Sequence, residues 1–268
     1  MICHNLEINV NENKASLQVM LWEESPELKL CDRPLILICP GGGYEMVSDR
    51  EADTVSTQFL AMGYHTAILR YTVAPARYPT ALLQLAGAMK MIRDNAAAWR
   101  VDANKIIVMG FSAGGHLAAS LGVFWKKDLL QDYYHCESGC FRPAGMILCY
   151  PVITSGEFAH RGSFHALLAE REDELSGEMS LEKQVSSDVP PTFLWHTDED
   201  DCVPVENSLM FYAALHRAGV PAEYHVFQKG GHGLGTANEL SETRDGYGIQ
   251  KECQCWTALA YTWLKSNF

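Results

Sequence analysis

Short runs of apolar and β-branched residues alternate with helical patterns along this chain of 268 residues. Such alternation is typical of parallel strands that are joined by crossover helices. Runs such as LILIC and IIVMGF are apolar throughout, as expected of strands that helices cover on both faces. The sequence therefore predicts an α/β fold with a mostly parallel central sheet flanked by helices. The expected core strands are Leu35–Cys39, His65–Tyr71, Lys105–Phe111, Gly145–Tyr150, Thr192–Thr197 and Glu223–Phe227.

Helical segments fall between these strands. Apolar residues recur there at helical spacing, and glycines such as Gly63 and Gly219 supply stop signals. The expected helices are Ala52–Met62, Pro79–Trp99, Gly114 to about Trp125, Val205–Ala218 and about Lys251–Leu264.

Two further segments complete the expected architecture. Ile2–Val10 and Ala15–Trp22 flank a polar NENK turn, which predicts an N-terminal hairpin. The polar stretch from about Thr154 to Val189 is too long for a plain loop, so we expect a small, helical, cap-like insertion there. Because this stretch follows a predicted strand, it should lie near the ligand-binding edge of the sheet. The chain length favours a single domain over residues 1–268.

The charge and hydropathy of the chain exclude several classes of partner. The formal net charge is −12, so no basic field exists to recruit nucleic acid or an anionic membrane. No apolar run reaches the ~18 residues of a transmembrane helix. The N-terminal sequence MICHNLEINVNENK lacks the pattern of a signal peptide. The nine cysteines form no paired framework, and together these features predict a cytoplasmic protein with free thiols.

The sequence Gly110-Phe111-Ser112-Ala113-Gly114 follows a predicted strand and precedes a helix-like segment. A Gly-x-Ser-x-Gly motif in this context is a nucleophile elbow. Its glycines are needed because larger side chains would collide with neighbouring backbone at the tight turn. A chance match is the alternative, and the flanking strand and helix argue against it. We therefore predict that Ser112 projects from the carboxyl end of the sheet as a nucleophile.

A serine hydroxyl needs a general base, and in this fold an acid and then a histidine follow the serine along the chain. Both partners are expected in loops that follow predicted strands. Glycines flank His232, the predicted base, whereas His116 and His196 are expected to be packed or hydrogen-bonded. Among the neighbouring acids, Asp200 fits the spacing His-x-x-x-Asp-x-x-Val-Pro, and Asp201 is the alternative.

The third element is Pro40-Gly41-Gly42-Gly43-Tyr44, directly after the run LILIC. Acyl transfer passes through an oxyanion that needs preorganised N–H donors, and a glycine-rich loop leaves its amides accessible. The amide of Ala113 should supply another donor. The alternatives are a plain turn or a phosphate-binding loop, and the latter lacks the Gly-x-x-x-x-Gly-Lys pattern.

These motifs together resemble the acetyl esterase/lipase group of α/β-hydrolases, near bacterial enzymes of the acetylxylan or feruloyl esterase type. The resemblance runs from about Pro34 to the C-terminus. It rests on the blocks PGGGYEMVSDRE, LRYTVAPARYP, GFSAGGHLAASL, PPTFLWHTDEDDCVPVENSL and GGHGLG. It implies the α/β-hydrolase fold, with Ser112 as nucleophile, Asp200 as acid and His232 as base. The oxyanion amides that it implies are those of Gly42, Gly43 and Ala113.

The same resemblance leaves the substrate pocket less defined. Tyr44, Ser48 and Arg50 match the PGGGY block and are candidates for the acyl or alcohol pocket, with structural roles as the alternative. Pro40 stands where the hormone-sensitive-lipase-like group usually has histidine, which should alter loop anchoring without removing the amides. The segment from Thr154 to Val189 matches least well, so the natural acyl donor and alcohol stay open.

The predicted function is hydrolysis of short carboxylic esters through an acyl-enzyme, with acetyl groups on sugars or xylo-oligosaccharides as the expected substrates. The expected partner is a small-molecule ester, no metal or organic cofactor is implied, and a homo-oligomer stays open. One alternative is a peptidase of the prolyl-oligopeptidase type, whose usual extra domain has no room here. Another is a non-catalytic binding protein, a class that tends to lose a triad member.

Overall fold

The computed structural model describes residues 1–28 and 31–268. Within them, one eight-stranded sheet has the order β1-β2-β4-β3-β5-β6-β7-β8. The pairs β1–β2 and β2–β4 are antiparallel, and the pairs from β4 through β8 are parallel. The predicted mostly parallel sheet with an N-terminal hairpin is confirmed. The strands are β1 (Ile2–Val10), β2 (Asn13–Leu21), β3 (Arg33–Cys39), β4 (His65–Arg70), β5 (Val101–Phe111), β6 (Gly145–Cys149), β7 (Thr192–Thr197) and β8 (Ala222–Phe227).

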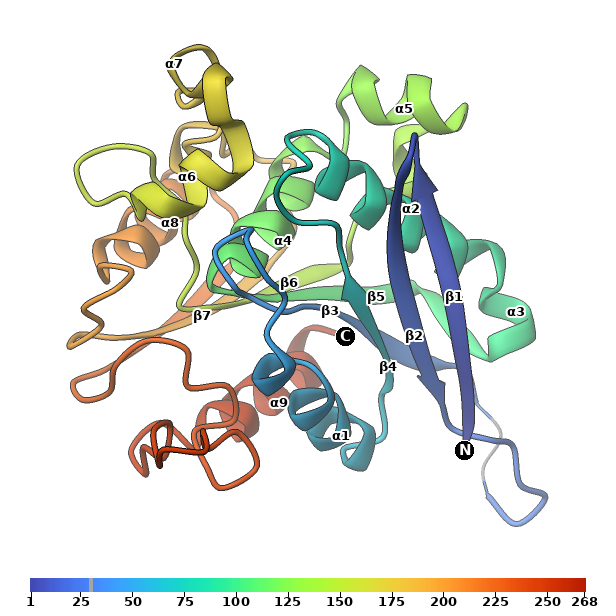
Figure 1. The fold of residues 1–268 in the computed structure, drawn as a ribbon. Coiled ribbons are helices and arrows are strands. Elements are labelled where there is room, and N and C mark those ends of the chain that lie inside the picture. Colours follow the sequence, from blue (N-terminus) through green and yellow to red (C-terminus); the bar gives the residue numbers. More distant parts are fainter. Residues whose placement is uncertain (29–30) are drawn as a thin grey trace.

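Helices cover both faces of this sheet (Figure 1). In β3, Leu35 and Leu37 belong to the core beneath α2 and α4, whereas Ile36 and Ile38 belong to the core beneath α1 and α9. Each of these four side chains is fully buried and contributes roughly 1.5–3 kcal/mol of hydrophobic stabilisation. The apolar run 35–38 therefore packs alternate side chains into two cores, one on each face of the sheet. The helices that cover the sheet are α1 (Asp53–Ala61), α2 (Thr80–Asp94), α4 (Ser112–Phe124), α8 (Glu206–Arg217) and α9 (Trp256–Asn267).

Some helix boundaries differ from the prediction. The single helix expected over Pro79–Trp99 is divided into α2 and α3 (Ala96–Trp99). The division falls at Asn95, whose side-chain amide donates to the Met91 carbonyl, and such local hydrogen bonds compete with the helix. The last helix was expected from about residue 251 and begins at Trp256 instead, because turns precede it.

Two other features complete the helical layer. Helix α5 (Asp128–Tyr134) has no counterpart among the predicted helices. The nucleophile helix begins at Ser112 itself rather than at Gly114. In residues 1–28 and 31–268, no helix combines the length and the apolar character needed to cross a membrane.

The stretch from 154 to 189 contains α6 (Arg161–Leu168) and α7 (Glu172–Leu175), joined by the 3-10 turn Ala169–Arg171, and a second 3-10 turn, Leu181–Lys183, follows α7. Helix α6 is packed against the domain, since Phe164, Leu167 and Leu168 are all buried. Backbone hydrogen bonding ties it to the segment before α2, where the Tyr78 amide donates to the Leu167 carbonyl. Figure 1 shows α6 and α7 at one end of the molecule, near α8.

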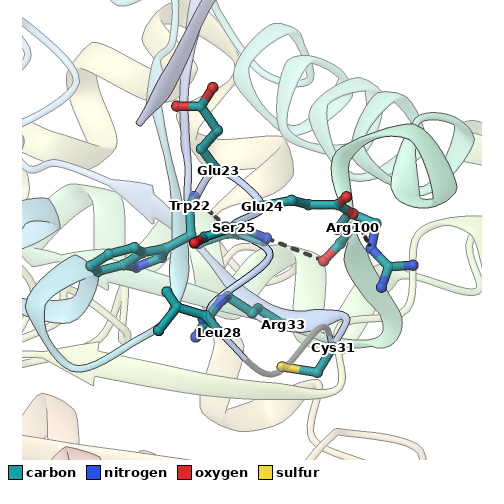
Figure 2. Close-up of a pocket in the computed structure, with 9 residues that line it drawn as sticks. Trp22, Glu23, Glu24, Ser25, Leu28, Cys31, Arg33 and Arg100 are labelled. Carbon is teal, nitrogen blue, oxygen red and sulfur yellow. Dashed lines mark hydrogen bonds and ion pairs between the residues drawn. The ribbon is translucent and has the colours of Figure 1, made fainter.

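The amino ends of the parallel strands carry a separate hollow, shown in Figure 2. Arg33 begins β3 and Arg100 precedes β5 there. The Arg100 side chain is paired with the carboxylates of Glu24 and Asp32. Ser112, in contrast, follows the carboxyl end of β5. Since ligands of open α/β sheets bind at the carboxyl ends of the strands, the functional site is expected at the edge opposite this hollow.

Candidate active site

Ser112 lies at the turn between β5 and α4, with φ of 52°. This left-handed backbone is strained for a residue other than glycine, and it lifts the side chain out of the strand direction. The turn is closed by backbone packing on both sides. A β-carbon at Gly110 would lie 2.1 Å from the Gly114 carbonyl oxygen, and one at Gly114 would lie 2.1 Å from the Cys39 carbonyl oxygen. The glycines of the elbow are therefore required by space, as the sequence predicted.

Ser112, His232 and Asp200 form one chain of hydrogen bonds. Ser112 Oγ lies 2.7 Å from His232 Nε2, and His232 Nδ1 lies 2.7 Å from Asp200 Oδ2. A carboxylate accepts and cannot donate, so Nδ1 of His232 carries the proton and Nε2 accepts from the serine hydroxyl. The distances and the tautomer are those that a nucleophile, a base and an orienting acid require.

Asp200 is hydrogen-bonded by other groups in addition to His232. Its Oδ1 accepts hydrogen bonds from the amides of Cys202 and Val203, and His196 Nε2 lies 3.2 Å from its Oδ2. Burial alone would raise the pKa of Asp200, but the hydrogen bonds from His196, His232 and Val203 outweigh it and hold the pKa well below its ordinary value. Asp200 is therefore a buried carboxylate that stays ionised.

Asp201, the alternative acid, is exposed, whereas the Asp200 side chain is fully buried. Asp200 is therefore the carboxylate of this pair that contacts His232 in the structure. His196 is hydrogen-bonded, as expected, through Ser208 Oγ and the Val203 carbonyl. His116 is likewise buried between Tyr44 and the Met179 carbonyl, and burial lowers its pKa to about 4.

The glycine-rich loop after β3 brings bare amides to Ser112. Gly42 and Gly43 have φ of 126° and 67°, values that favour glycine. The Gly41 amide donates to Glu51 Oε2. In the described part of the chain, the amides of Gly42 and Gly43 take part in no hydrogen bond. Ala113 lies in the first turn of α4, where backbone amides have no partner within the helix.

The candidate pocket residues have different surroundings. Tyr44 is buried, and together with Val152, Ser163, Phe164 and Leu167 it lines a small hollow beside α6. Ser163 Oγ would lie 4.0 Å from a β-carbon at Gly43. Helix α6 therefore lies next to the glycine loop at Gly43.

Arg50 and Ser48, in contrast to Tyr44, are hydrogen-bonded to the backbone of neighbouring loops. Arg50 Nε donates to the Ser241 carbonyl, and its guanidinium lies over the ring of Tyr247. The Ser48 amide donates to the Gly41 carbonyl. Both residues thus hold loops of the site together, which fits the structural role given above as the alternative to a role in the substrate pocket.

Two residues near the triad were not singled out by the sequence. Glu51 is buried beneath the glycine loop, and Tyr150 follows β6 with its ring 5.1 Å from the ring of His232. Glu51 belongs to the SDRE portion of the block that begins with PGGGY. No spacing rule separates it from the surface acids of this chain, so only the packed structure identifies it.

A model of the BD-FAE family matches residues 25–215 of this chain. Among curated proteins, endo-1,4-beta-xylanase B of Butyrivibrio fibrisolvens is 39% identical over 77% of this chain and 33% of its own length. The acetylxylan esterase of Xylanibacter ruminicola is 26% identical over 85% of this chain and 45% of its own length. The chain thus spans a third to just under half of these relatives.

A solved structure is similar over nearly its whole length. The acetyl ester-xyloside bifunctional hydrolase of Caldicellulosiruptor lactoaceticus is 37% identical, with a TM-score of 0.82 over 96% of this chain and 89% of that protein. The likeness therefore extends to both the arrangement of the elements and the sequence.

Proposed function

This chain belongs to the BD-FAE family, and from that premise we propose that it is a serine esterase that hydrolyses short acyl esters. The observation that carries the proposal is the continuous hydrogen-bonded chain from Ser112 through His232 to Asp200. Acetyl groups on sugars or xylo-oligosaccharides are the proposed substrates, because similar proteins are named for acetyl esters and xylan.

The proposed reaction begins when Ser112 Oγ attacks the ester carbonyl carbon and His232 Nε2 takes its proton. Asp200 holds the imidazole in the productive tautomer and stabilises the imidazolium. The amides of Gly42, Gly43 and Ala113 stabilise the oxyanion. His232 then returns the proton to the departing alcohol. Water, deprotonated by His232, attacks the acyl-enzyme in the second half of the reaction and releases the acid.

The acyl pocket is expected to accept short chains. Phe164 and Leu167 of α6 line the small hollow beside the glycine loop, so we expect a long acyl chain to find little space there. A methylene that clashes with the wall costs about 1–3 kcal/mol. For p-nitrophenyl esters from two to twelve carbons, kcat/KM should therefore peak between acetyl and butyryl.

A matched variant tests the source of this limit. Leu167→Ala shortens one wall and should move the preferred acyl group to a longer chain, whereas Leu129→Ala on α5 should not. A wild-type profile that peaks at eight carbons or beyond would refute the short-acyl proposal. Activity on peptide anilides with none on esters would favour a peptidase.

The wild-type kcat/KM for p-nitrophenyl acetate is expected to rise with pH from the acid side of the assay range. The base must be neutral to accept the serine proton, so acid removes the active form. Asp200 does not contribute to this rise, because its depressed pKa keeps it ionised throughout the assay range. His116, with a pKa of about 4, is also unchanged. A flat profile from pH 5 to 9 would contradict the assignment of His232.

A further inference from the structure

Glu51 is a second buried carboxylate beside the triad, with 3% of its surface exposed. Its Oε2 accepts the Gly41 amide at 2.7 Å, and its Oε1 accepts the Tyr150 hydroxyl at 2.8 Å. The Tyr150 oxygen in turn accepts the Gly235 amide at 2.8 Å. Glu51 thus connects the glycine loop after β3 with Tyr150 at the end of β6, and Tyr150 extends the connection to the loop that carries His232.

The hydrogen bonds also indicate the charge of Glu51. The Tyr150 hydroxyl donates to Glu51 Oε1, and the Gly41 amide donates to Oε2. Two donors directed at the two carboxyl oxygens stabilise a carboxylate, which only accepts. Burial raises the pKa of Glu51, and the hydrogen bonds from Tyr150 and Gly41 oppose that effect. The geometry favours the ionised form.

This charge lies close to the catalytic imidazole. A β-carbon at Gly233, the residue after His232, would lie 3.9 Å from Glu51 Oε1. The Tyr150 ring meets the His232 ring edge to face at 5.1 Å. At the other end of Glu51, a β-carbon at Gly41 would lie 2.8 Å from Oε2 and 2.9 Å from Ser112 Cβ. The Glu51 carboxylate therefore lies close to the backbone segments that carry Ser112 and His232.

Other titratable groups share this region. The groups that face Glu51 are Arg50, Tyr71, Cys149, Tyr150 and His232. The groups that face His232 are Glu51, Tyr150, His160, Asp200 and Tyr247. Arg50 is the only fixed cation in the first set.

We propose that Glu51 is a positioning residue for ester hydrolysis, which fixes the oxyanion loop through Gly41 and stabilises the imidazolium of His232 by its buried negative charge. This inference rests on the proposed function. It assigns two effects to one side chain. Loss of the loop contact should lower kcat, and loss of the charge should favour neutral His232 and so move the pH profile of kcat/KM toward lower pH.

The test compares Glu51→Gln with Tyr150→Phe, using p-nitrophenyl acetate from pH 5 to 9. Glu51→Gln removes the charge and keeps the size. We expect kcat to fall roughly 10–100-fold with little change in KM, and the midpoint of the profile to move to lower pH. Tyr150→Phe removes the hydroxyl that contacts Glu51 Oε1 and the Gly235 amide, and it leaves the carboxyl group of Glu51 and its contact to Gly41 in place. It should lower kcat by about tenfold without moving the midpoint to lower pH.

Asp198→Asn is the matched control, because it removes an exposed carboxylate from the loop that holds Asp200. It should change neither kcat nor the midpoint, since exposed charges are screened.

Wild-type kcat and midpoint in Glu51→Gln would overturn the proposal. A reduced kcat with an unmoved midpoint would also overturn it, because a merely structural role would give that result. If Glu51→Gln does not fold, wild-type activity of Tyr150→Phe would overturn it. An inactive wild-type enzyme that also resists a fluorophosphonate probe would instead refute the proposed function.

Discussion

Ser112→Ala is expected to lower kcat for p-nitrophenyl acetate by roughly 10⁴–10⁶ while the fold persists, because loss of a triad nucleophile typically has an effect of this size. The hydroxyl is the only group of the proposed triad that can form the acyl-enzyme. Its removal leaves His232 Nε2 without the proton donor that lies 2.7 Å away. Alanine fits the elbow, since it keeps the β-carbon of Ser112.

Two controls accompany this measurement. The thermal unfolding midpoint of Ser112→Ala should stay close to that of the wild type, which shows that the loss is chemical. A fluorophosphonate probe should label the wild type and not the variant. If Ser112→Ala keeps more than about a tenth of the wild-type activity, Ser112 is not the nucleophile.

Asp200→Asn should lower kcat by about 10⁴. An asparagine amide can donate to Nδ1, which would stabilise the opposite imidazole tautomer and direct an N–H toward Ser112 instead of a lone pair. The asparagine carbonyl oxygen can still accept the hydrogen bonds that the backbone amides of Cys202 and Val203 donate to Asp200 Oδ1. The loop should therefore hold its shape while the base loses its orientation.

Asp201→Asn is the matched control for this variant. It removes the same charge from the next residue, which is exposed, and should leave kcat within about threefold of the wild type because surface charges are screened. A larger loss in Asp201→Asn than in Asp200→Asn would assign the acid role to Asp201.

The parts of the site that the sequence predicted are those that follow strands. Ser112, Asp200 and His232 each lie in a segment after a predicted strand, and parallel strands bring their carboxyl ends to one edge. Local patterns were sufficient for them because the motif and its flanking elements are close in sequence. The elbow glycines followed from the same local argument.

Other features depend on contacts between distant segments. Glu51 reaches Tyr150 across 99 residues of chain, and His196 is recognisable as a support for Asp200 only when both are placed. The break at Asn95 was missed because its cause is a single side-chain hydrogen bond. Helix α6 was anticipated as part of a helical insertion, but its packing next to Gly43 required the fold.

The close backbone contact at Gly114 has a consequence for sequence divergence. Because the nucleophile helix touches the carbonyl oxygens of Cys39 and Pro40 directly, no intervening side chain sets the spacing between the serine and the glycine loop. Gly110 and Gly114 themselves therefore have almost no freedom to change, because a side chain at either position would push the helix away from the strand ends that it touches.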